Sequence, residues 1–297
     1  MNRDPLNIIF ITGSSYSGTT VLGLILGSSP KIFNGGEVCK YQEIKNQDFK
    51  IDPNREVNNI CTCGKKYTTC AYWGKIFNDY QKDIDFNPAG FSKENLRLMF
   101  KILNPFNQLK SEKKITEEYW KYSELLFREA RKLKPHAKYL LDVSKSIYNL
   151  YLLKNAYHVN VKVIHMVRNP LDTCNSFKKH RVGFFYSITS WILVNVFVKI
   201  FINRAGFESI TIKYEKLCTK TDEIFKELNQ FLNIKLETNS FVEKVNIENF
   251  HVVAGNPFLN DFSFTGLKIK KSKNRLSKLE KLIIILLSTP FKRWIYK

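Results

Sequence analysis

Residues 8–37 constrain the fold of this 297-residue chain more than any other stretch. Ile8–Ile11 is a short apolar run of the kind that forms a buried parallel strand. The small residues of Gly13–Gly18 can fold into a tight turn in which several backbone N–H groups point to one place. Thr19 then begins an apolar helix. A helix N-terminus after such a turn can hold a phosphate group, because its N–H groups and its dipole favour an anion.

This turn is neither of two familiar phosphate-binding motifs. A Walker A loop needs a Lys directly before its Ser or Thr, and residues 13–20 contain no Lys. The G-x-G-x-x-G fingerprint of dinucleotide-binding proteins is absent as well. Turns of this composition also join strands to helices in proteins that bind nothing there. The turn alone therefore leaves a phosphate site and a plain connection open.

The string Ser17-Gly18-Thr19-Thr20 lies between an apolar strand and an apolar helix. It resembles the 5′-phosphosulfate-binding loop of sulfotransferases that use 3′-phosphoadenosine 5′-phosphosulfate (PAPS). The resemblance implies that PAPS is the co-substrate of this protein. The loop residues implied to bind it are Ser14, Ser15, Tyr16, Ser17, Gly18, Thr19 and Thr20.

A second element far along the chain supports this resemblance. The apolar run Val161–Val167 predicts another buried strand, and Pro170 suits the first turn of the helix that follows. The string VRNPLDTCNSF resembles the 3′-phosphate element of the same family, in which an Arg and a Ser eight residues later bind the nucleotide 3′-phosphate. The matching residues are Arg168 and Ser176. A guanidinium suits this task because it forms paired, charge-assisted hydrogen bonds with phosphate.

Shorter strings extend the resemblance over most of residues 8–257. Three of them resemble a bacterial-type branch of the family, and the last resembles a late family strand that ends in Tyr-Glu-x-Leu. They are Tyr139–Ser146 (YLLDVSKS), Cys61–Gly64 with Cys70 and Trp73, His251–Pro257 (HVVAGNP), and Ile210–Leu217 (ITIKYEKL). Tyr214, in the last string, is therefore included among the expected nucleotide-binding residues.

Apolar segments with the length and residue types of strands alternate with helical patterns. They are residues 8–12, 139–143, 161–167 and 209–213. The alternation predicts an α/β fold with a central parallel β-sheet flanked by helices. The resemblance implies the P-loop-like, three-layer form of this fold. We expect a single domain over residues 1–297, with a largely helical cap insert at about 40–134 and a basic C-terminal segment at about 265–297.

Glu37 is the expected general base, because sulfuryl transfer to a hydroxyl needs a group that takes up its proton. Residues 32–36 would return the chain to the mouth of the phosphate loop. In tyrosylprotein sulfotransferases, which the chain resembles here, a catalytic Glu follows the S-G-T-T string at the same distance. A turn carboxylate that caps the following helix is the alternative. His180 and His251 are reserve candidates for the base.

The phosphate loop departs from the family pattern at one position. The family places Lys or Arg directly before S-G-T-T, where the charge contacts the phosphate and the transferring sulfonate. Tyr16 stands there instead and offers one neutral hydrogen bond. Either another cation replaces that charge, for which Lys145 in the D-x-S-K-S loop is the best candidate, or the chain is a slow or inactive relative. We therefore place Lys145 with Glu37 in the catalytic set.

The formal net charge of +20 suits a protein that binds anions. The lysines are scattered and no nucleic-acid-binding motif is visible, so no nucleic-acid partner is expected. The leading hypothesis is an enzyme, a sulfotransferase that moves a sulfuryl group from PAPS to a hydroxyl of a carbohydrate, lipid or other small acceptor. One alternative is an inactive relative that only binds nucleotide or nucleic acid. Another is a small-molecule kinase with a degenerate P-loop, in which Asp142 would hold Mg²⁺.

Two apolar segments bear on location. Residues 184–202 are long enough to cross a membrane, but they carry polar residues and follow the nucleotide-binding helix, so a buried helix is expected. Residues 282–287 are too short to span a bilayer, and flanking basic residues make them a candidate for contact with a membrane surface. Residues 1–6 lack the layout of a secretory signal. We expect a cytoplasmic protein whose C-terminal segment is a candidate contact with the cytoplasmic face of a membrane.

Cys61, Cys63 and Cys70 lie close together in the sequence. Their C-x-C-x6-C spacing supplies three metal ligands and is not that of a zinc finger, with Cys39 as a candidate fourth ligand. Zinc, a disulfide and plain structural thiols stay open, with plain thiols favoured. No metal is expected to be required for the reaction.

Overall fold

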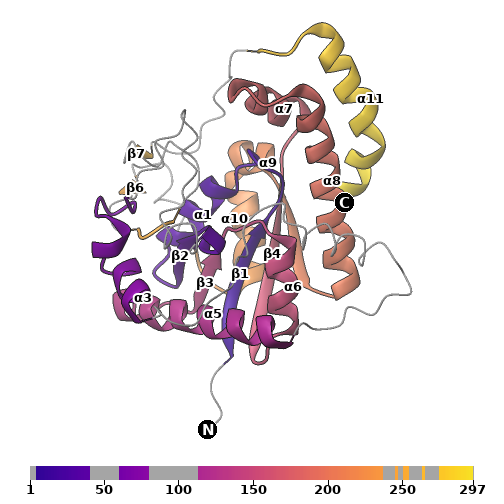
Figure 1. Cartoon of the computed structure of the whole chain (residues 1–297). Helices are drawn as coiled ribbons and strands as arrows, with labels where there is room; N and C mark the ends of the chain where they lie inside the picture. The colour runs from indigo at the N-terminus through magenta and orange to yellow at the C-terminus, as the bar shows by residue number, and fades with distance from the viewer. Residues whose placement is uncertain are drawn as a thin grey trace. The chain divides into compact units, whose positions relative to one another are not determined.

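The structure is a computed structural model that describes residues 5–40, 60–79, 113–236, 245–246, 250–253, 263–264 and 274–296. Much of the expected cap insert and of the basic run before residue 274 lies outside these residues. Five strands form one parallel sheet in the order β2-β3-β1-β4-β5, flanked by helices (Figure 1). The strands are β1 (Leu6–Thr12), β2 (Ile32–Gly36), β3 (Tyr139–Asp142), β4 (Val159–Val167) and β5 (Glu208–Lys213). The predicted fold class is confirmed.

The remaining described elements are mostly helices. They are α1 (Thr19–Ser28), α3 (Trp73–Asp79), α5 (Lys113–Leu133), α6 (Ile147–Asn155), α7 (Pro170–Lys179), α8 (Phe184–Ala205), α9 (Tyr214–Thr219), α10 (Thr221–Leu232) and α11 (Lys278–Ile295). Short 3-10 turns lie at η1 (Val38–Lys40) and η2 (Tyr67–Thr69), and β6 (Val245–Asn246) pairs antiparallel with β7 (Ser263–Phe264).

The chain divides into two compact units, and strands β1 and β4 contribute residues to both. The first unit contains Met1–Phe10, Thr20–Lys162 and Leu236–Gly266. The second contains Ile11–Thr19, Val163–Lys235 and Leu267–Lys297. The expected single domain over the whole chain stays a prediction.

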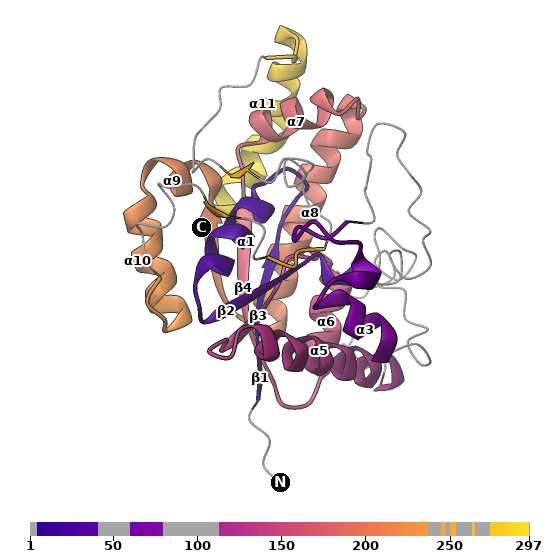
Figure 2. The ribbon, with the colours of Figure 1, turned by 90° about the vertical axis from the view of Figure 1, so that its left-hand side faces the viewer.

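In the first unit, β3 lies between β1 and β2 and pairs in parallel with both. Ile8, Ile9 and Phe10 of β1 are at most 2% exposed, as expected for a strand with both faces covered. Helix α5 packs against β2, β3, α3 and α6 (Figure 2). It begins at Lys113 and buries a stripe of side chains that includes Tyr119 and Tyr122. This part of the expected insert is therefore helical and packs against the sheet.

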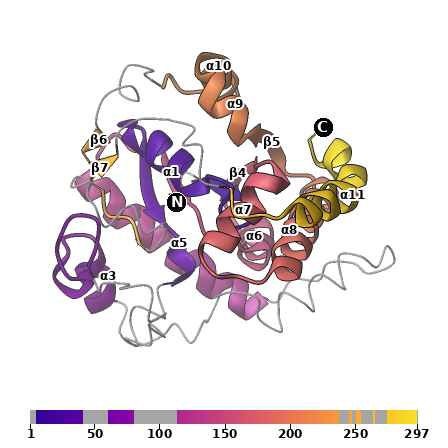
Figure 3. The same ribbon diagram turned by 90° about the horizontal axis from the view of Figure 1, so that it is seen from above.

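In the second unit, α7, α8 and α11 pack against one another (Figures 1 and 3). Asn169 caps the N-terminus of α7 by accepting a hydrogen bond from the Leu171 N–H at 3.0 Å, and Pro170 occupies the first turn as predicted. Helix α11 begins with a capping box formed by Ser277 and Glu280. Glu280 also pairs with Lys178 of α7 at 2.7 Å, which joins the two helices.

Helix α8 is the one helix among the described residues that is long and apolar enough to cross a membrane. Its side chains at nine positions are nevertheless buried inside the protein. Trp191 packs with Val167 and Ile295, and Ile188 packs with Ile284. These contacts agree with the expected buried helix. The core helix of a folded protein can be as long and as apolar as a membrane-spanning helix, so length and composition alone do not separate the two.

Candidate functional site

The predicted phosphate loop joins the carboxyl end of β1 to α1, and its backbone conformation requires glycine at two positions. Gly13 has φ +148°, and a Cβ there would lie 2.2 Å from the Met166 carbonyl oxygen. Gly18 has φ +96°, and a Cβ there would lie 2.3 Å from the Tyr214 ring. Tyr16 also has positive φ, at 62°. Left-handed residues within such a loop turn backbone N–H groups inward, which is the geometry of an anion-binding concavity.

Three buried polar atoms in or beside this loop have no hydrogen-bond partner within the described part of the chain. The hydroxyls of Ser14 and Ser17 are buried and have no hydrogen-bond partner among the residues that the structure describes. The Nε of Arg168 is also buried and also has no hydrogen-bond partner among these residues. Because an unpaired buried polar group is unfavourable, these atoms indicate a polar ligand that completes them. Hydroxyl donors and a guanidinium are the groups that bind phosphate, so this set of residues fits the nucleotide that the sequence predicts.

Arg168 reaches the phosphate loop directly. It follows β4, and its Nη1 donates hydrogen bonds to the Tyr16 carbonyl at 3.1 Å and to Ser176 Oγ at 3.3 Å. Its guanidinium carbon lies 4.8 Å from the centroid of the Tyr214 ring, a cation–π contact. The Trp191 indole N–H donates to the Arg168 carbonyl at 2.9 Å and holds this end of the strand in place. The structure thus brings together the predicted 5′ loop and the predicted 3′-phosphate residues, although their roles stay predictions.

Tyr16, which replaces the usual cation, has its ring fixed against helix α7. The ring stacks on His180 with centroids 4.9 Å apart and meets Phe177 edge-on at 4.8 Å. These contacts explain how a bulky residue is held at φ 62°. They also place His180, a reserve candidate for the base, against the loop.

Glu37 and Lys145 form a close ion pair in the first unit. They follow the carboxyl ends of the paired strands β2 and β3, and Lys145 Nζ lies 2.7 Å from Glu37 Oε1. Lys40 lies 3.7 Å from the other carboxylate oxygen. Burial alone would raise the pKa of Glu37, but the charges and hydrogen bonds of the two lysines outweigh burial and leave that pKa lowered. Glu37 is therefore ionised at neutral pH, as a general base must be.

The backbone of Glu37 is held by a distant segment. Its N–H donates to the Val253 carbonyl at 2.9 Å, and the Val253 N–H donates to the Gly35 carbonyl at 3.3 Å. Gly36 has φ +75°, and a Cβ there would lie 2.5 Å from the Val253 carbonyl oxygen. The approach of this segment therefore requires glycine directly before Glu37.

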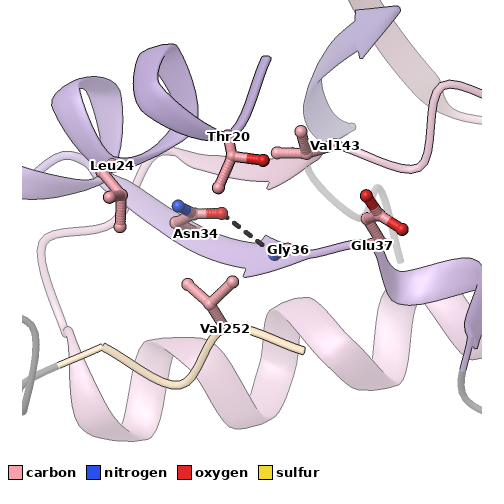
Figure 4. A pocket seen from close by; sticks show the side chains of 7 residues that line it. All are labelled: Thr20, Leu24, Asn34, Gly36, Glu37, Val143 and Val252. Carbon is pink, nitrogen blue, oxygen red and sulfur yellow. Dashed lines mark hydrogen bonds between the residues drawn. The ribbon is translucent and has the colours of Figure 1, made fainter. Parts of the chain in front are cut away.

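A small pocket connects Glu37 with the last residue of the predicted loop (Figure 4). Its lining residues, all from the first unit, are Thr20, Leu24, Asn34, Gly36, Glu37, Val143 and Val252. Asn34 Oδ1 accepts a hydrogen bond from the Gly36 N–H at 2.9 Å and fixes the turn before Glu37. The pocket is apolar apart from Thr20, Asn34 and the Glu37 carboxylate, which suits a site that excludes water around one acidic group.

Asp142, the residue that a kinase would use for Mg²⁺, is buried and hydrogen-bonded within the protein. It is 2% exposed and accepts hydrogen bonds from the Ser144 N–H at 2.8 Å and from the Tyr119 hydroxyl at 3.2 Å. Burial raises the pKa of Asp142 to about 6, and the neighbouring Glu37 charge adds to this effect, while these hydrogen bonds partly oppose it. A buried carboxyl with a raised pKa is a poor ligand for a strongly hydrated cation, which counts against the kinase alternative.

Three cysteines and one histidine form a cluster that sequence reasoning did not assemble. The members are Cys61, Cys63, Cys70 and His251, and their ligand atoms all lie within 4.8 Å of one another. The six cysteines are free thiols. Cys39, the candidate fourth ligand, is not part of this cluster, and its backbone N–H donates to Ser144 Oγ. The sequence signal was the proximity of the three cysteines; no spacing rule connects them to a histidine 181 residues after Cys70.

Comparison with protein families finds a match to the sulfotransferase family over residues 8–238. A sulfotransferase domain from the olefin synthase of Synechococcus PCC 7002 superposes with a TM-score of 0.54 at 17% identity, covering 98% of this chain and 96% of that one. A sulfotransferase domain from the curacin biosynthetic pathway gives the same TM-score and identity over 98% and 99%. A search of curated proteins found no match. At this identity the solved structures support the fold, whereas the family match covers most of the sequence. The chain belongs to the sulfotransferase family.

Proposed function

We propose that this protein transfers a sulfuryl group from PAPS to a hydroxyl of a carbohydrate, lipid or other small acceptor. Membership of the sulfotransferase family supports sulfuryl transfer in general. The observation that carries the nucleotide assignment is the set of buried atoms at Ser14, Ser17 and Arg168 that find no hydrogen-bond partner among the described residues. PAPS supplies the sulfuryl group, whose bond to the 5′-phosphate oxygen breaks as a bond to the acceptor oxygen forms, leaving adenosine 3′,5′-bisphosphate.

The proposed roles follow from the chemistry of each side chain. The loop from Ser14 to Thr20 binds the 5′-phosphate through backbone N–H groups and hydroxyls. Arg168 and Ser176 bind the 3′-phosphate, with Tyr214 against the guanidinium. Glu37 takes the proton of the acceptor hydroxyl. Lys145 keeps Glu37 ionised and supplies the positive charge that Tyr16 does not.

Thermal-shift measurements test the nucleotide assignment. Adenosine 3′,5′-bisphosphate at one hundred times its Kd should stabilise the protein by about 2.7 kcal/mol, and neither ATP with Mg²⁺ nor an oligonucleotide should match it. Arg168→Ala should weaken bisphosphate binding at least about tenfold, because it removes charge-assisted hydrogen bonds. Lys226→Ala, which removes an exposed charge from α10, is the matched control and should bind normally. Preferential stabilisation by ATP with Mg²⁺ or by the oligonucleotide would overturn the assignment in favour of a kinase or a nucleic-acid-binding protein.

We also propose a cytoplasmic location with contact between α11 and an anionic membrane surface. Apolar side chains of α11 are exposed at Leu279, Leu282, Ile285, Leu286, Leu287, Phe291 and Trp294. Lys281, Lys292 and Arg293 accompany them, as on helices that lie in a membrane interface. In sedimentation with anionic vesicles, the protein should pellet, and the double variant Leu282→Asp and Leu286→Asp should stay in solution. Equal partitioning of the two proteins would dismiss the idea.

A further inference from the structure

The cluster of Cys61, Cys63, Cys70 and His251 has the dimensions of a tetrahedral metal site. Cys63 Sγ lies 3.8 Å from Cys70 Sγ. His251 Nδ1 lies 3.2 Å from Cys70 Sγ and 3.9 Å from Cys61 Sγ. Zinc bonds of usual length in a tetrahedron place two sulfurs about 3.8 Å apart and a sulfur and a nitrogen about 3.6 Å apart. All four ligand atoms lie within 4.8 Å of one another, so small side-chain movements would let one zinc ion bond to all of them.

The backbone around the cysteines is shaped to present them together. The Cys61 N–H donates to the Lys65 carbonyl and the Gly64 N–H donates to the Cys61 carbonyl, both at 2.8 Å. Gly64 has φ +80°, so a glycine allows this tight turn. The turn places Cys61 and Cys63 on one side, and η2 then brings Cys70 back to them.

His251 is held in position by groups outside the cluster. The Trp73 indole N–H donates to the His251 carbonyl at 2.8 Å. The Thr62 hydroxyl donates to the Phe250 carbonyl at 2.7 Å and accepts from the Val252 N–H at 3.0 Å. These bonds clamp the backbone on both sides of the histidine. They fix the backbone from which the His251 imidazole reaches the cysteine sulfurs.

We propose that Cys61, Cys63, Cys70 and His251 bind one structural zinc ion. The donor set of three sulfurs and one imidazole nitrogen suits zinc and excludes magnesium and calcium, which take oxygen ligands. Four protein ligands close the coordination sphere, so the ion has a structural role and takes no part in sulfuryl transfer. A disulfide would use only two of the three cysteines, and it would not explain why the third cysteine and His251 lie beside them.

The zinc ion would tie the 61–70 segment to residues 250–253. This second segment supplies Val253, whose carbonyl accepts from the Glu37 N–H and whose N–H bonds to Gly35. The metal site thus supports the backbone of the proposed general base without touching the reacting groups. The inference concerns metal content and does not depend on the proposed reaction.

Metal analysis of the purified full-length protein tests the inference. We expect about one zinc per chain, retained after dialysis without chelator. Replacing zinc by Co²⁺ should give the strong visible absorption of tetrahedral cobalt with thiolate charge-transfer bands in the near ultraviolet. Cys63→Ser and His251→Gln should each weaken metal binding at least about tenfold, since each removes one ligand. Cys39→Ser and Cys218→Ser, which change cysteines outside the cluster, should keep one zinc per chain.

Measurements on the wild-type protein test the zinc proposal even where a ligand variant fails to fold. Protein purified without chelator that contains no zinc and takes up no Co²⁺ would overturn the proposal. So would a disulfide between cluster cysteines, found by mass spectrometry of protein alkylated without reduction. Loss of zinc in Cys39→Ser with retention in His251→Gln would show that the fourth ligand is assigned wrongly. None of these readouts depends on turnover, so failure of the proposed reaction leaves them interpretable.

Discussion

Replacing Glu37 by Gln is expected to lower kcat about 100- to 10,000-fold, because the variant lacks the carboxylate that accepts the acceptor proton. The amide oxygen of Gln can still accept the hydrogen bond from Lys145, which spans 2.7 Å in the native protein. Affinity for adenosine 3′,5′-bisphosphate should therefore stay unchanged. Turnover is measured as release of this product from PAPS, with the best acceptor from a panel of sugars, lipids and small alcohols.

Glu129→Gln is the matched control for this variant. Glu129 is also a buried carboxylate, 2% exposed, and pairs with Lys132 at 2.7 Å and with Arg128 at 3.3 Å. If loss of a buried ion pair explained the effect, both variants would lose activity. We expect loss with Glu37→Gln only. Retention of kcat within about tenfold in Glu37→Gln would rule out Glu37 as the base.

Lys145→Ala tests the other half of the ion pair and should abolish turnover without unfolding the protein. Without the Lys145 charge, the pKa of Glu37 should rise, because that charge is the largest of the influences that lower it. Any residual activity should therefore require a higher pH than in the native enzyme. Residual turnover with an unshifted acid limb of the pH profile would remove Lys145 from this role.

Replacing Asp142 by Asn is expected to stabilise the protein at neutral pH by about 2 kcal/mol relative to its effect near pH 4, where part of the full effect is already present. The pKa of Asp142 is raised from 3.8 to about 6 in the folded protein, and a difference of this size corresponds to about 3 kcal/mol. Well below pH 3.8 Asp142 is protonated in both the folded and the unfolded chain, so its ionisation does not change the free energy of unfolding. Between the two pKa values the unfolded chain releases its proton first, so stability is lost as pH rises toward 6.

The introduced amide does not titrate, so the Asp142→Asn variant should not lose stability as the pH rises from 4 to 7. Its oxygen can still accept from the Ser144 N–H, and its nitrogen can donate to the Tyr119 oxygen, so the packing is retained. Urea unfolding near pH 4 and near pH 7 measures the difference. A gain for Asp142→Asn that is equal at both pH values would contradict the assignment.

The sequence predicts strands and helices well where apolar residues and glycines leave little choice. The loop between β1 and α1 and the helix after Pro170 lie as expected, because Gly13, Gly18 and Pro170 restrict the backbone locally. Strand β2 was not predicted. Its Asn-Gly-Gly ending has low strand propensity, yet all five of its residues are buried. Pairing with β3 and contact with Val253 stabilise it, and both are tertiary effects.

The candidate site shows the same division. The loop and Arg168 are readable because each element lies in one short string. The ion pair between Glu37 and Lys145 was not predicted, although both residues were, since it depends on β2 and β3 being neighbours. The partner of the three cysteines was not predicted either. A ligand that arrives from a distant segment leaves no local pattern for sequence reasoning to follow.

The segment around Val253 also bears on how much of the chain is needed. The family match ends at residue 238, yet the acceptor for the Glu37 N–H lies at Val253 and the fourth member of the cysteine cluster at His251. A polypeptide that ended at residue 238 would keep every residue proposed to contact the substrates. It would lose Val253, which holds the backbone of Glu37. We therefore expect a functional polypeptide to extend at least to Val253, beyond the span of the family match.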